Sequence, residues 1–271
     1  MIKINDFIVD QKHFPDGTYL LNNIPHIFER FNYTVELDWR YEGEHEVSLL
    51  ILISKYIKEN YPKTSLILKM FFVPNSRMDR TYKRSEVFTL KYFCEIINDL
   101  HFDNVIVMDT HSNVTNALLN KVSERPLLEL NQLIHNYKHI YFPDEGAQKR
   151  YSKVLNLSNK YIYTGSKRRN WATGDIEGLD ILSHHESSNK DKVLMIDDIC
   201  SYGGTFLFSA EKLKKLGFET IDAYCTHAEP VVNDPNSRIQ MALKNNLINK
   251  LYTTDTLLQN TDCENIIIYH V

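Results

Sequence analysis

The chain has 271 residues, of which 43% are hydrophobic and 24% are charged, and its formal net charge is −4. This length allows one large domain or two ordinary ones with real hydrophobic cores. The mildly acidic balance excludes a general attraction to nucleic acid or to anionic membranes, and no apolar run approaches the roughly 20 residues of a membrane span. We therefore expect neither a nucleic-acid nor a membrane partner.

Short apolar runs alternate along the chain with longer amphipathic runs. The apolar runs predict strands at residues 65–73, 104–109, 139–144, 160–166, 192–198 and 220–228, and the amphipathic runs predict helices at residues 44–61, 87–102 and 204–218. The predicted strands are almost continuously apolar and most of them end in a polar residue, which is typical of parallel strands covered by helices on both faces. The pattern predicts an open α/β sheet, whose ligands bind at the carboxyl ends of the strands.

Two segments of the chain share one pattern. VIVMDTHSNVTNALL (105–119) and VLMIDDICSYGGTFLF (193–208) each contain an apolar strand, an aspartate at its end, a short loop and a helix. The repeat predicts two similar halves, which we place at residues 1–130 and 131–271. The polar segment 168–191 predicts a long mobile loop, and such loops within compact domains are usually functional.

The cysteines are few and well separated. Cys94, Cys200, Cys225 and Cys263 include no C-x-x-C pair, which favours buried reduced thiols over zinc binding or disulfides. The N-terminus also lacks an uninterrupted apolar core of the signal-peptide type. We therefore expect a cytoplasmic location.

The segment VLMIDDICSYGGTF (193–206) combines three chemical features. Its strand ends in Asp197 and Asp198, and carboxylates at a sheet edge can accept hydrogen bonds from vicinal hydroxyls or hold Mg²⁺. The following SYGGT supplies glycines, hydroxyls and the start of a helix, all of which suit a phosphate. Taken separately, each feature fits a solvated strand end with Thr205 as a helix N-cap. Together they predict a pocket for ribose 5-phosphate.

This segment resembles the phosphoribosyl-diphosphate motif of the type I phosphoribosyltransferases. Within that superfamily the chain resembles a short variant of the ribose-phosphate diphosphokinases, also called phosphoribosyl diphosphate synthetases. The resemblance rests on further blocks in matching order and spacing: HFPDGT (13–18), FFVPNSRMDRTYKRSEVFTLKYF (71–93), VIVMDTH (105–111), YFPDEGAQKR (141–150) and SKRRN (166–170). It implies two phosphoribosyltransferase-like halves, each a mostly parallel sheet flanked by helices, with ATP on the N-terminal side and the ribose-phosphate motif on the C-terminal side.

The resemblance also implies a role for each matched residue. The residues expected to bind ATP are Phe14, Asp16, Arg77, Asp79, Arg80 and His111. Those expected to bind the ribose phosphate are Asp197, Asp198, Ser201, Tyr202, Gly203, Gly204 and Thr205. The Mg²⁺ that accompanies ATP is expected at His111, Asp144, Asp197 and Asp198. Catalysis is expected from Lys167, Arg169 and His111, with the basic pair neutralising charge on the diphosphoryl group in flight.

Several of these residues have equally simple structural explanations. The guanidiniums of Arg77 and Arg80 can bind a polyphosphate while Asp79 orients one of them, or they can form an exposed ion-pair cluster. His111 can be a metal ligand, a donor to ATP or a histidine that caps a loop. The basic run of SKRRN fits a lid over the phosphoryl oxygens, or an ordinary solvated segment.

The activity that the resemblance implies is transfer of the β,γ-diphosphate of Mg·ATP to the anomeric C1 hydroxyl of ribose 5-phosphate, which gives phosphoribosyl diphosphate and AMP. As in that family, we expect a homodimer or a higher homo-oligomer.

Three departures from the family pattern leave alternatives open. Thr18 and Met78 replace the usual acidic residue and glutamine, and Ser201-Tyr202 replaces the usual Asp-Thr pair beside the sugar's 5-substituent. The main alternative is the same chemistry on a larger acceptor such as ADP-ribose, as in phage-type NAD-rebuilding pathways. Further alternatives are a phosphoribosyltransferase that consumes the diphosphate and a non-catalytic regulatory homologue.

Overall fold

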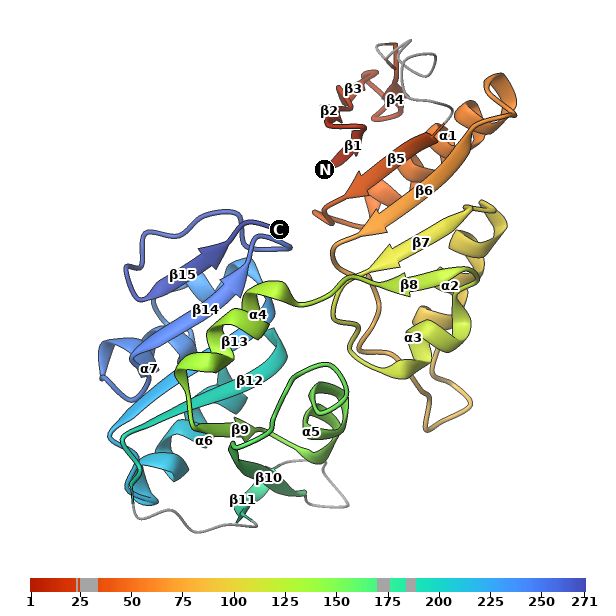
Figure 1. Ribbon diagram of the computed structural model, residues 1–271. Helices are drawn as coiled ribbons and strands as arrows, with labels where there is room; N and C mark the ends of the chain where they lie inside the picture. Colours follow the sequence, from red (N-terminus) through yellow and green to blue (C-terminus); the bar gives the residue numbers. More distant parts are fainter. Residues whose placement is uncertain (23, 25–33, 170–175, 184–188) are drawn as a thin grey trace. The chain divides into compact units, whose positions relative to one another are not determined.

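The computed structural model describes residues 1–22, 24, 34–169, 176–183 and 189–271. The chain divides into two compact units, Met1–Arg125 and Pro126–Val271. Each unit contains a sheet and the helices that pack on it (Figure 1).

The first unit has, among its described residues, a six-stranded sheet in the order β2-β1-β5-β6-β7-β8. The strands β5 to β8 are parallel, and β1 is antiparallel to both of its neighbours. The bounds are β1 Ile2–Ile4, β2 Phe7–Ile8, β5 Thr34–Trp39, β6 Ser65–Met70, β7 Asn104–Val107 and β8 Val122–Glu124, with helices α1 His45–Asn60, α2 Thr89–Asp99 and α3 Asn113–Leu118, and a separate hairpin of β3 Lys12–His13 and β4 Tyr19–Leu20.

The strands of this first sheet alternate between buried and half-buried positions. On the buried face, Leu68 of β6 shares one hydrophobic core with Leu50 of α1 and Phe93 of α2. On the other face, the Lys69 ammonium lies 2.6 Å from a carboxylate oxygen of Glu36. This charged face differs from the burial on both faces that the apolar runs predict.

The second unit has a seven-stranded sheet among its described residues, in the order β11-β10-β9-β12-β13-β14-β15. All neighbouring strands are parallel except β10 and β11. The bounds are β9 His139–Phe142, β10 Tyr161–Arg169, β11 Ile176–Ser183, β12 Lys192–Cys200, β13 Thr220–Ala228, β14 Lys250–Thr254 and β15 Ile266–Tyr269, with α4 Leu128–Leu133, α5 Glu145–Tyr151, α6 Gly204–Lys215, α7 Arg238–Lys244 and the 3₁₀ turns η2 Ile134–Asn136 and η3 Pro230–Asn233.

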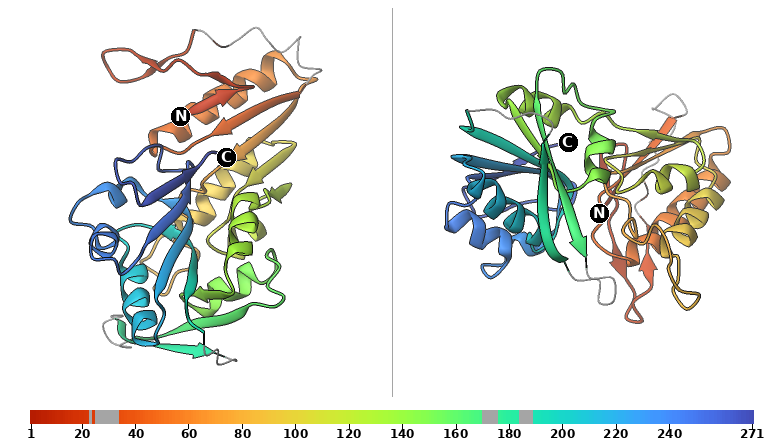
Figure 2. Two further views of the ribbon diagram at one scale, coloured as in Figure 1. Left: turned by 60° about the vertical axis from the view of Figure 1, so that its left-hand side comes forward. Right: turned by 90° about the horizontal axis from the view of Figure 1, so that it is seen from below.

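The centre of the second sheet is buried on both faces. Helices α6 and α7 lie on one face of the sheet and α5 lies on the other (Figures 1 and 2). Val193 and Met195 of β12 share a core with Phe206 and Leu213 of α6. The nearly continuous burial of β12 and β13 explains their apolar sequences and confirms the predicted α/β fold class.

The predicted strands and helices are present, with ends that differ by a few residues. The predicted long loop over residues 168–191 is wrong in part, because Ile176–Ser183 forms β11 and pairs antiparallel with β10. The apolar residues of this strand are diluted by polar neighbours, so the composition of the whole segment hides it. Residues 170–175 and 184–188 lie outside the described part of the chain.

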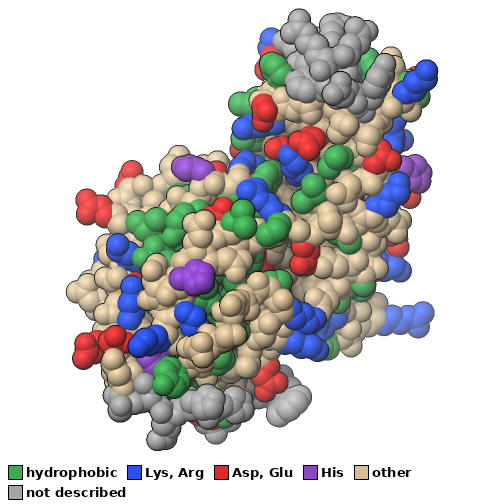
Figure 3. All heavy atoms as spheres, viewed as in Figure 1, with side chains coloured by type: hydrophobic (Ala, Val, Ile, Leu, Met, Phe, Trp, Pro, Cys, Tyr) green, Lys and Arg blue, Asp and Glu red, His purple; other side chains and the backbone are tan. Residues whose placement is uncertain are grey.

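The distribution of charged side chains and the burial of the cysteines agree with what the composition predicts. Acidic and basic side chains are interspersed on the face shown in Figure 3. Of the four free cysteines, Cys263 is half-buried and the others are buried. Within the described residues, none of the helices has the length and apolar character to cross a bilayer.

Candidate functional site

A tight turn joins β12 to α6 at the carboxyl end of the central strand. The N-cap of α6 is Gly203, whose φ of +81° is left-handed. A Cβ on this glycine would lie 2.5 Å from the Cβ of Ile239, closer than real Cβ contacts allow. Thr205 lies inside the first turn of the helix and is not its N-cap. The close approach of α7 therefore requires glycine at this position.

The first N–H groups of α6 have no acceptor among the residues that the structure describes. The helix makes its first hydrogen bond from the Leu207 N–H to the Gly203 carbonyl, at 2.9 Å. The N–H groups of residues 203–206 form no hydrogen bond with any part of the chain that the structure describes. Such groups carry the partial positive charge of a helix N-terminus and are suited to a phosphate.

The two predicted sugar-binding carboxylates differ in their surroundings. Asp198 has a side chain only 4% exposed, and it accepts a hydrogen bond from Nη2 of Arg150 at 2.8 Å. The Asp197 side chain is 18% exposed, and its Oδ1 accepts a hydrogen bond from the Asp198 N–H at 3.0 Å. Burial, then the neighbouring Asp198 and Asp144 charges, hold the pKa of Asp197 well above its ordinary value, while Arg150 opposes the shift. The pair is therefore a site of concentrated negative charge.

Helix α5 supplies the third carboxylate of this cluster. Asp144 is the N-cap of α5, and its Oδ1 accepts a hydrogen bond from the Ala147 N–H at 3.0 Å. Its charge also reaches Asp197, where it contributes to the raised pKa. The carboxyl ends of β9 and β12 thus bring the Pro-Asp segment and the Asp-Asp segment of the sequence together.

The residues of the second unit fit a magnesium ion that arrives with phosphate ligands. Asp144, Asp197 and Asp198 supply hard oxygen donors, and when ionised they exceed the single charge of Arg150 by two. Among the described residues, no group of three His, Cys, Asp or Glu side chains is placed to hold a metal ion. Magnesium typically keeps several waters and binds one or two carboxylates together with substrate phosphates. His111, the fourth predicted ligand, belongs to the first unit.

In the first unit, Asp79 connects two of the predicted ATP-binding segments. Its carboxylate pairs with Arg80 through Nε at 2.7 Å and Nη2 at 2.9 Å, although Asp79 is buried and the Arg80 side chain is 63% exposed. The hydrogen bonds from Arg80, then the nearby Ser112 hydroxyl and the Arg80 and His111 charges, lower the pKa of Asp79. Arg77 is exposed. This arrangement presents the Arg80 guanidinium in a fixed orientation at the surface.

The N-terminal matches lie in a hairpin turn between β3 and β4. The Phe14 N–H donates to the Thr18 carbonyl at 2.9 Å, which closes the turn. Asp16 accepts hydrogen bonds from the N–H and the hydroxyl of Thr18, at 3.0 and 2.7 Å. The backbone N–H of Thr18 is the main cause of the lowered pKa of Asp16. The carboxylate therefore stabilises the turn, and the half-exposed Phe14 ring remains accessible.

The two predicted catalytic basic residues lie near the end of β10. Their backbones pair with β11, Lys167 opposite Leu179 and Arg169 opposite Ile176. Their side chains lie outside the part of the structure that we describe.

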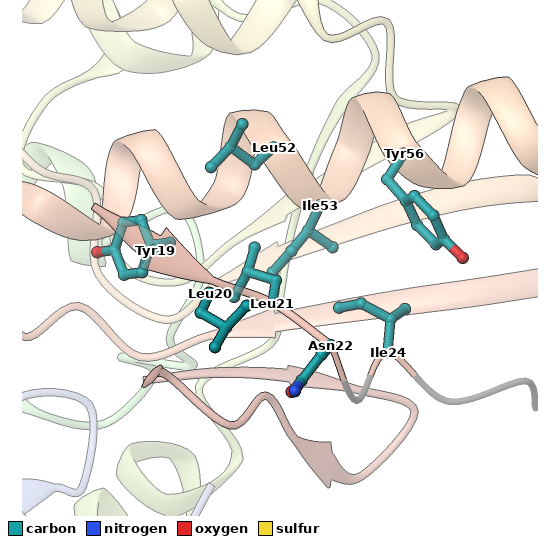
Figure 4. A pocket seen from close by; sticks show the side chains of 8 residues that line it. All are labelled: Tyr19, Leu20, Leu21, Asn22, Ile24, Leu52, Ile53 and Tyr56. Carbon is teal, nitrogen blue, oxygen red and sulfur yellow. The ribbon is translucent and has the colours of Figure 1, made fainter. Parts of the chain in front are cut away.

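A pocket of about 480 Å³ in the first unit contains none of the predicted site residues. Figure 4 shows α1 side chains on one side and those of β4 and the residues after it on the other. None of the lining residues that the structure describes is charged, so this lining does not suit a polyphosphate. The lining residues are Tyr19, Leu20, Leu21, Asn22, Ile24, Leu52, Ile53 and Tyr56.

The sequence did not identify Arg150 as part of the site. It is the last residue of the YFPDEGAQKR block, and only the fold shows that it reaches Asp198. The only indication in the sequence is the pattern of buried positions within α5. Ala147 and Tyr151 mark the buried face of α5, and Arg150 lies beside that face.

Comparisons with known proteins agree on one group of enzymes, although no protein-family model matches the chain. The ribose-phosphate pyrophosphokinase of Sulfurisphaera tokodaii is 26% identical over 260 residues, which cover 93% of this chain and 85% of the relative. The enzyme of the same name from Pyrococcus abyssi is 24% identical over 275 residues, which cover 97% and 89%. The crystal structure of phosphoribosylpyrophosphate synthetase from Mycobacterium smegmatis is similar in fold, with a TM-score of 0.73 at 14% identity over 97% of this chain and 86% of that one.

Proposed function

We propose that this chain, which is a homologue of the ribose-phosphate pyrophosphokinases and has a phosphoribosyltransferase-type fold, transfers the β,γ-diphosphate of Mg·ATP to the C1 hydroxyl of ribose 5-phosphate. The observation that carries this proposal is the turn after β12. Its N–H groups at residues 203–206 have no acceptor within the described part of the chain, and the turn follows directly on the strand that carries Asp197 and Asp198. The N–H groups suit a phosphate and the carboxylates suit a diol, and ribose 5-phosphate carries these two groups at its opposite ends.

In this proposal the second unit positions the nucleophile. The N–H groups of residues 203–206 and the hydroxyls of Ser201 and Thr205 bind the 5-phosphate. Asp197 and Asp198 accept hydrogen bonds from the 2- and 3-hydroxyls and so fix the ring. The C1 oxygen then forms a bond to the β-phosphorus as its proton passes to water, and the bond from that phosphorus to the α–β bridging oxygen breaks to release AMP. Positioning and electrostatic stabilisation account for most of such a rate enhancement.

The first unit would supply the groups that hold ATP. The exposed guanidinium of Arg80, fixed by Asp79, is suited to bidentate binding of a phosphate, with Arg77 and His111 as further donors. Magnesium, when bound with the nucleotide, neutralises part of the charge on its phosphates. The carboxylate cluster of the second unit would hold that ion.

We predict that Lys167→Ala and Arg169→Ala lower kcat far more than they weaken ATP binding. A charge that stabilises the diphosphoryl group in flight contributes mainly in the transition state, so we expect a loss of roughly a hundredfold or more in kcat. Single-turnover kinetics and equilibrium binding of ATP separate the two effects. Lys153→Ala, at an exposed position of the same unit, is the control. A large loss of ATP affinity with an unchanged kcat would instead mean that Lys167 and Arg169 bind ATP in the ground state and do not act in the transition state.

A second acceptor is favoured by one observation on the phosphate turn. The Tyr202 side chain is 60% exposed, while its backbone carbonyl accepts a hydrogen bond from the Ile239 N–H at 3.1 Å. The backbone is therefore fixed, and the ring stands free beside the proposed phosphate site. A base stacked on such a ring gains about 1–3 kcal/mol. ADP-ribose, bound through its inner phosphate, is accordingly the second candidate acceptor after ribose 5-phosphate.

A competition between the two acceptors tests both candidates. Purified protein is mixed with Mg·ATP and either ribose 5-phosphate or ADP-ribose, and AMP release and product mass are followed. If ADP-ribose is the acceptor, the parent prefers it and Tyr202→Thr loses roughly tenfold of that preference. Efficient turnover of ribose 5-phosphate alone removes the larger acceptor. Absence of AMP release with both acceptors contradicts the proposed function and favours a non-catalytic homologue.

A further inference from the structure

Helix α5 contacts three segments of the proposed site in the second unit. Its N-cap, Asp144, is one of the predicted magnesium ligands. The side-chain oxygen of Gln148 accepts a hydrogen bond from the Thr164 hydroxyl at 2.8 Å, on the same strand as the predicted catalytic basic residues. Arg150, near the end of the helix, reaches the Asp-Asp pair of β12. One short helix thus connects β9, β10 and β12 at the ligand edge of the sheet.

The guanidinium of Arg150 is held by the protein on two sides. Its Nη2 lies 2.8 Å from Oδ1 of Asp198 and 3.9 Å from Oδ1 of Asp197. Its central carbon lies 5.1 Å from the centre of the Tyr151 ring, which stacks on Phe142 of β9 at 6.0 Å and 11°. Both rings are fully buried, and the Arg150 side chain is only 19% exposed. The orientation of this guanidinium is therefore set without any ligand.

Stability alone does not require this ion pair. Helix α5 is already anchored by the buried Ala147 and Tyr151 and by its Asp144 cap. The energetic gain of a buried ion pair is largely offset by the cost of removing both charges from water. Its more distinctive effect is to give a carboxylate a single direction, which a diol-binding site needs from its acceptors.

We infer that Arg150 is a positioning residue for sugar binding, which acts through Asp198, and this inference rests on the proposed function. Arg150 donates a hydrogen bond to the more buried carboxylate, that of Asp198, and the same Nη2 lies 3.9 Å from Oδ1 of Asp197. The orientation of Arg150 is thus passed to both carboxylates. Without Arg150, both would lose the spacing that matches adjacent ribose hydroxyls.

Two substitutions of Arg150 test the inference. Arg150→Met removes the donors but keeps most of the length, and Arg150→Lys keeps the charge with a different geometry. We expect the Met variant to bind ribose 5-phosphate roughly tenfold to a hundredfold more weakly by calorimetry without ATP. Its KM for ATP should change by less than about twofold, and the Lys variant should recover part of the loss. Lys149→Met, at the adjacent exposed position of α5, should match the parent.

A double-variant comparison distinguishes positioning from direct contact. Asp198→Asn and the double variant Asp198→Asn, Arg150→Met should bind ribose 5-phosphate equally, within about threefold. The double variant removes both members of the Arg150–Asp198 ion pair, so neither is left without the other, and it remains informative if Arg150→Met does not fold. A further loss in the double variant means that Arg150 touches the ligand and overturns the inference. Unchanged affinity in Arg150→Met overturns it as well, whereas a parent that binds no ribose 5-phosphate contradicts the proposed function itself.

Discussion

Asp197→Asn is expected to remove more than about 99% of the activity while leaving the protein folded, as is typical when a preorganised polar group is lost. Asp198→Asn is expected to be equally inactive but also less stable by about 1–3 kcal/mol, because it removes the charged partner of Arg150. The two substitutions are nearly isosteric, so neither leaves a cavity. The two variants differ in expected stability because Asp198 pairs closely with Arg150, whereas Asp197 accepts its short hydrogen bond from a backbone N–H.

The pH dependence of stability gives an independent check on Asp197. Its pKa is raised from 3.8 in the folded protein, so the folded state binds more protons than the unfolded state as pH rises above that value. The free energy of unfolding therefore falls with rising pH through the raised pKa, and this decline disappears in Asp197→Asn. Thermal unfolding between about pH 4 and pH 8, in metal-free buffer, measures the difference.

A control substitution at the other end of β12 separates an effect on the proposed site from a general effect of replacing an aspartate near this strand. Asp191→Asn changes an exposed aspartate that directly precedes β12, at the end of the strand opposite the Asp-Asp pair. It should retain parental AMP release and parental stability. Retained turnover in Asp197→Asn or in the double Asn variant would show that these carboxylates serve the fold and not the sugar.

The sequence predicts the central part of the second unit well because burial there is nearly complete. Strands such as β12 and β13 have helices on both sides, so their sequences are continuous apolar runs that point directly to a parallel sheet. The acidic pair and the glycine turn follow from chain order alone, because both lie at the carboxyl end of one strand. These are local features, and a local pattern is sufficient to find them.

Features that depend on distant contacts were less predictable. Nothing near Arg150 in the sequence indicates that it meets Asp198, 48 residues away. The sequence wrongly predicts β11 to be a loop, because its pairing with β10 is what makes it a strand. For Gly203 the sequence predicts a phosphate turn, but the close approach of Ile239 on α7 becomes visible only in the fold.

Gly203→Ala is expected to lose both stability and affinity for ribose 5-phosphate. A left-handed conformation costs an L-residue about 1–2 kcal/mol, and the new Cβ would lie 2.5 Å from the Cβ of Ile239. Relief of that contact requires α6 and α7 to separate, which displaces the N–H groups that we assign to the phosphate. We expect the affinity for ribose 5-phosphate to fall roughly tenfold or more.

Gly217→Ala is the matched control for this substitution, because it shares the backbone strain and lacks the clash. Gly217 has a φ of +96° just after α6, and the nearest atom to a Cβ there is 3.9 Å away. It should lose about 1–2 kcal/mol of stability in chemical denaturation and keep parental binding of ribose 5-phosphate by calorimetry. The difference between the two variants therefore isolates the contact between the turn and α7. If both variants bind ribose 5-phosphate equally well, the N–H groups of this turn do not form the phosphate site, and the sugar must be held by the carboxylates alone.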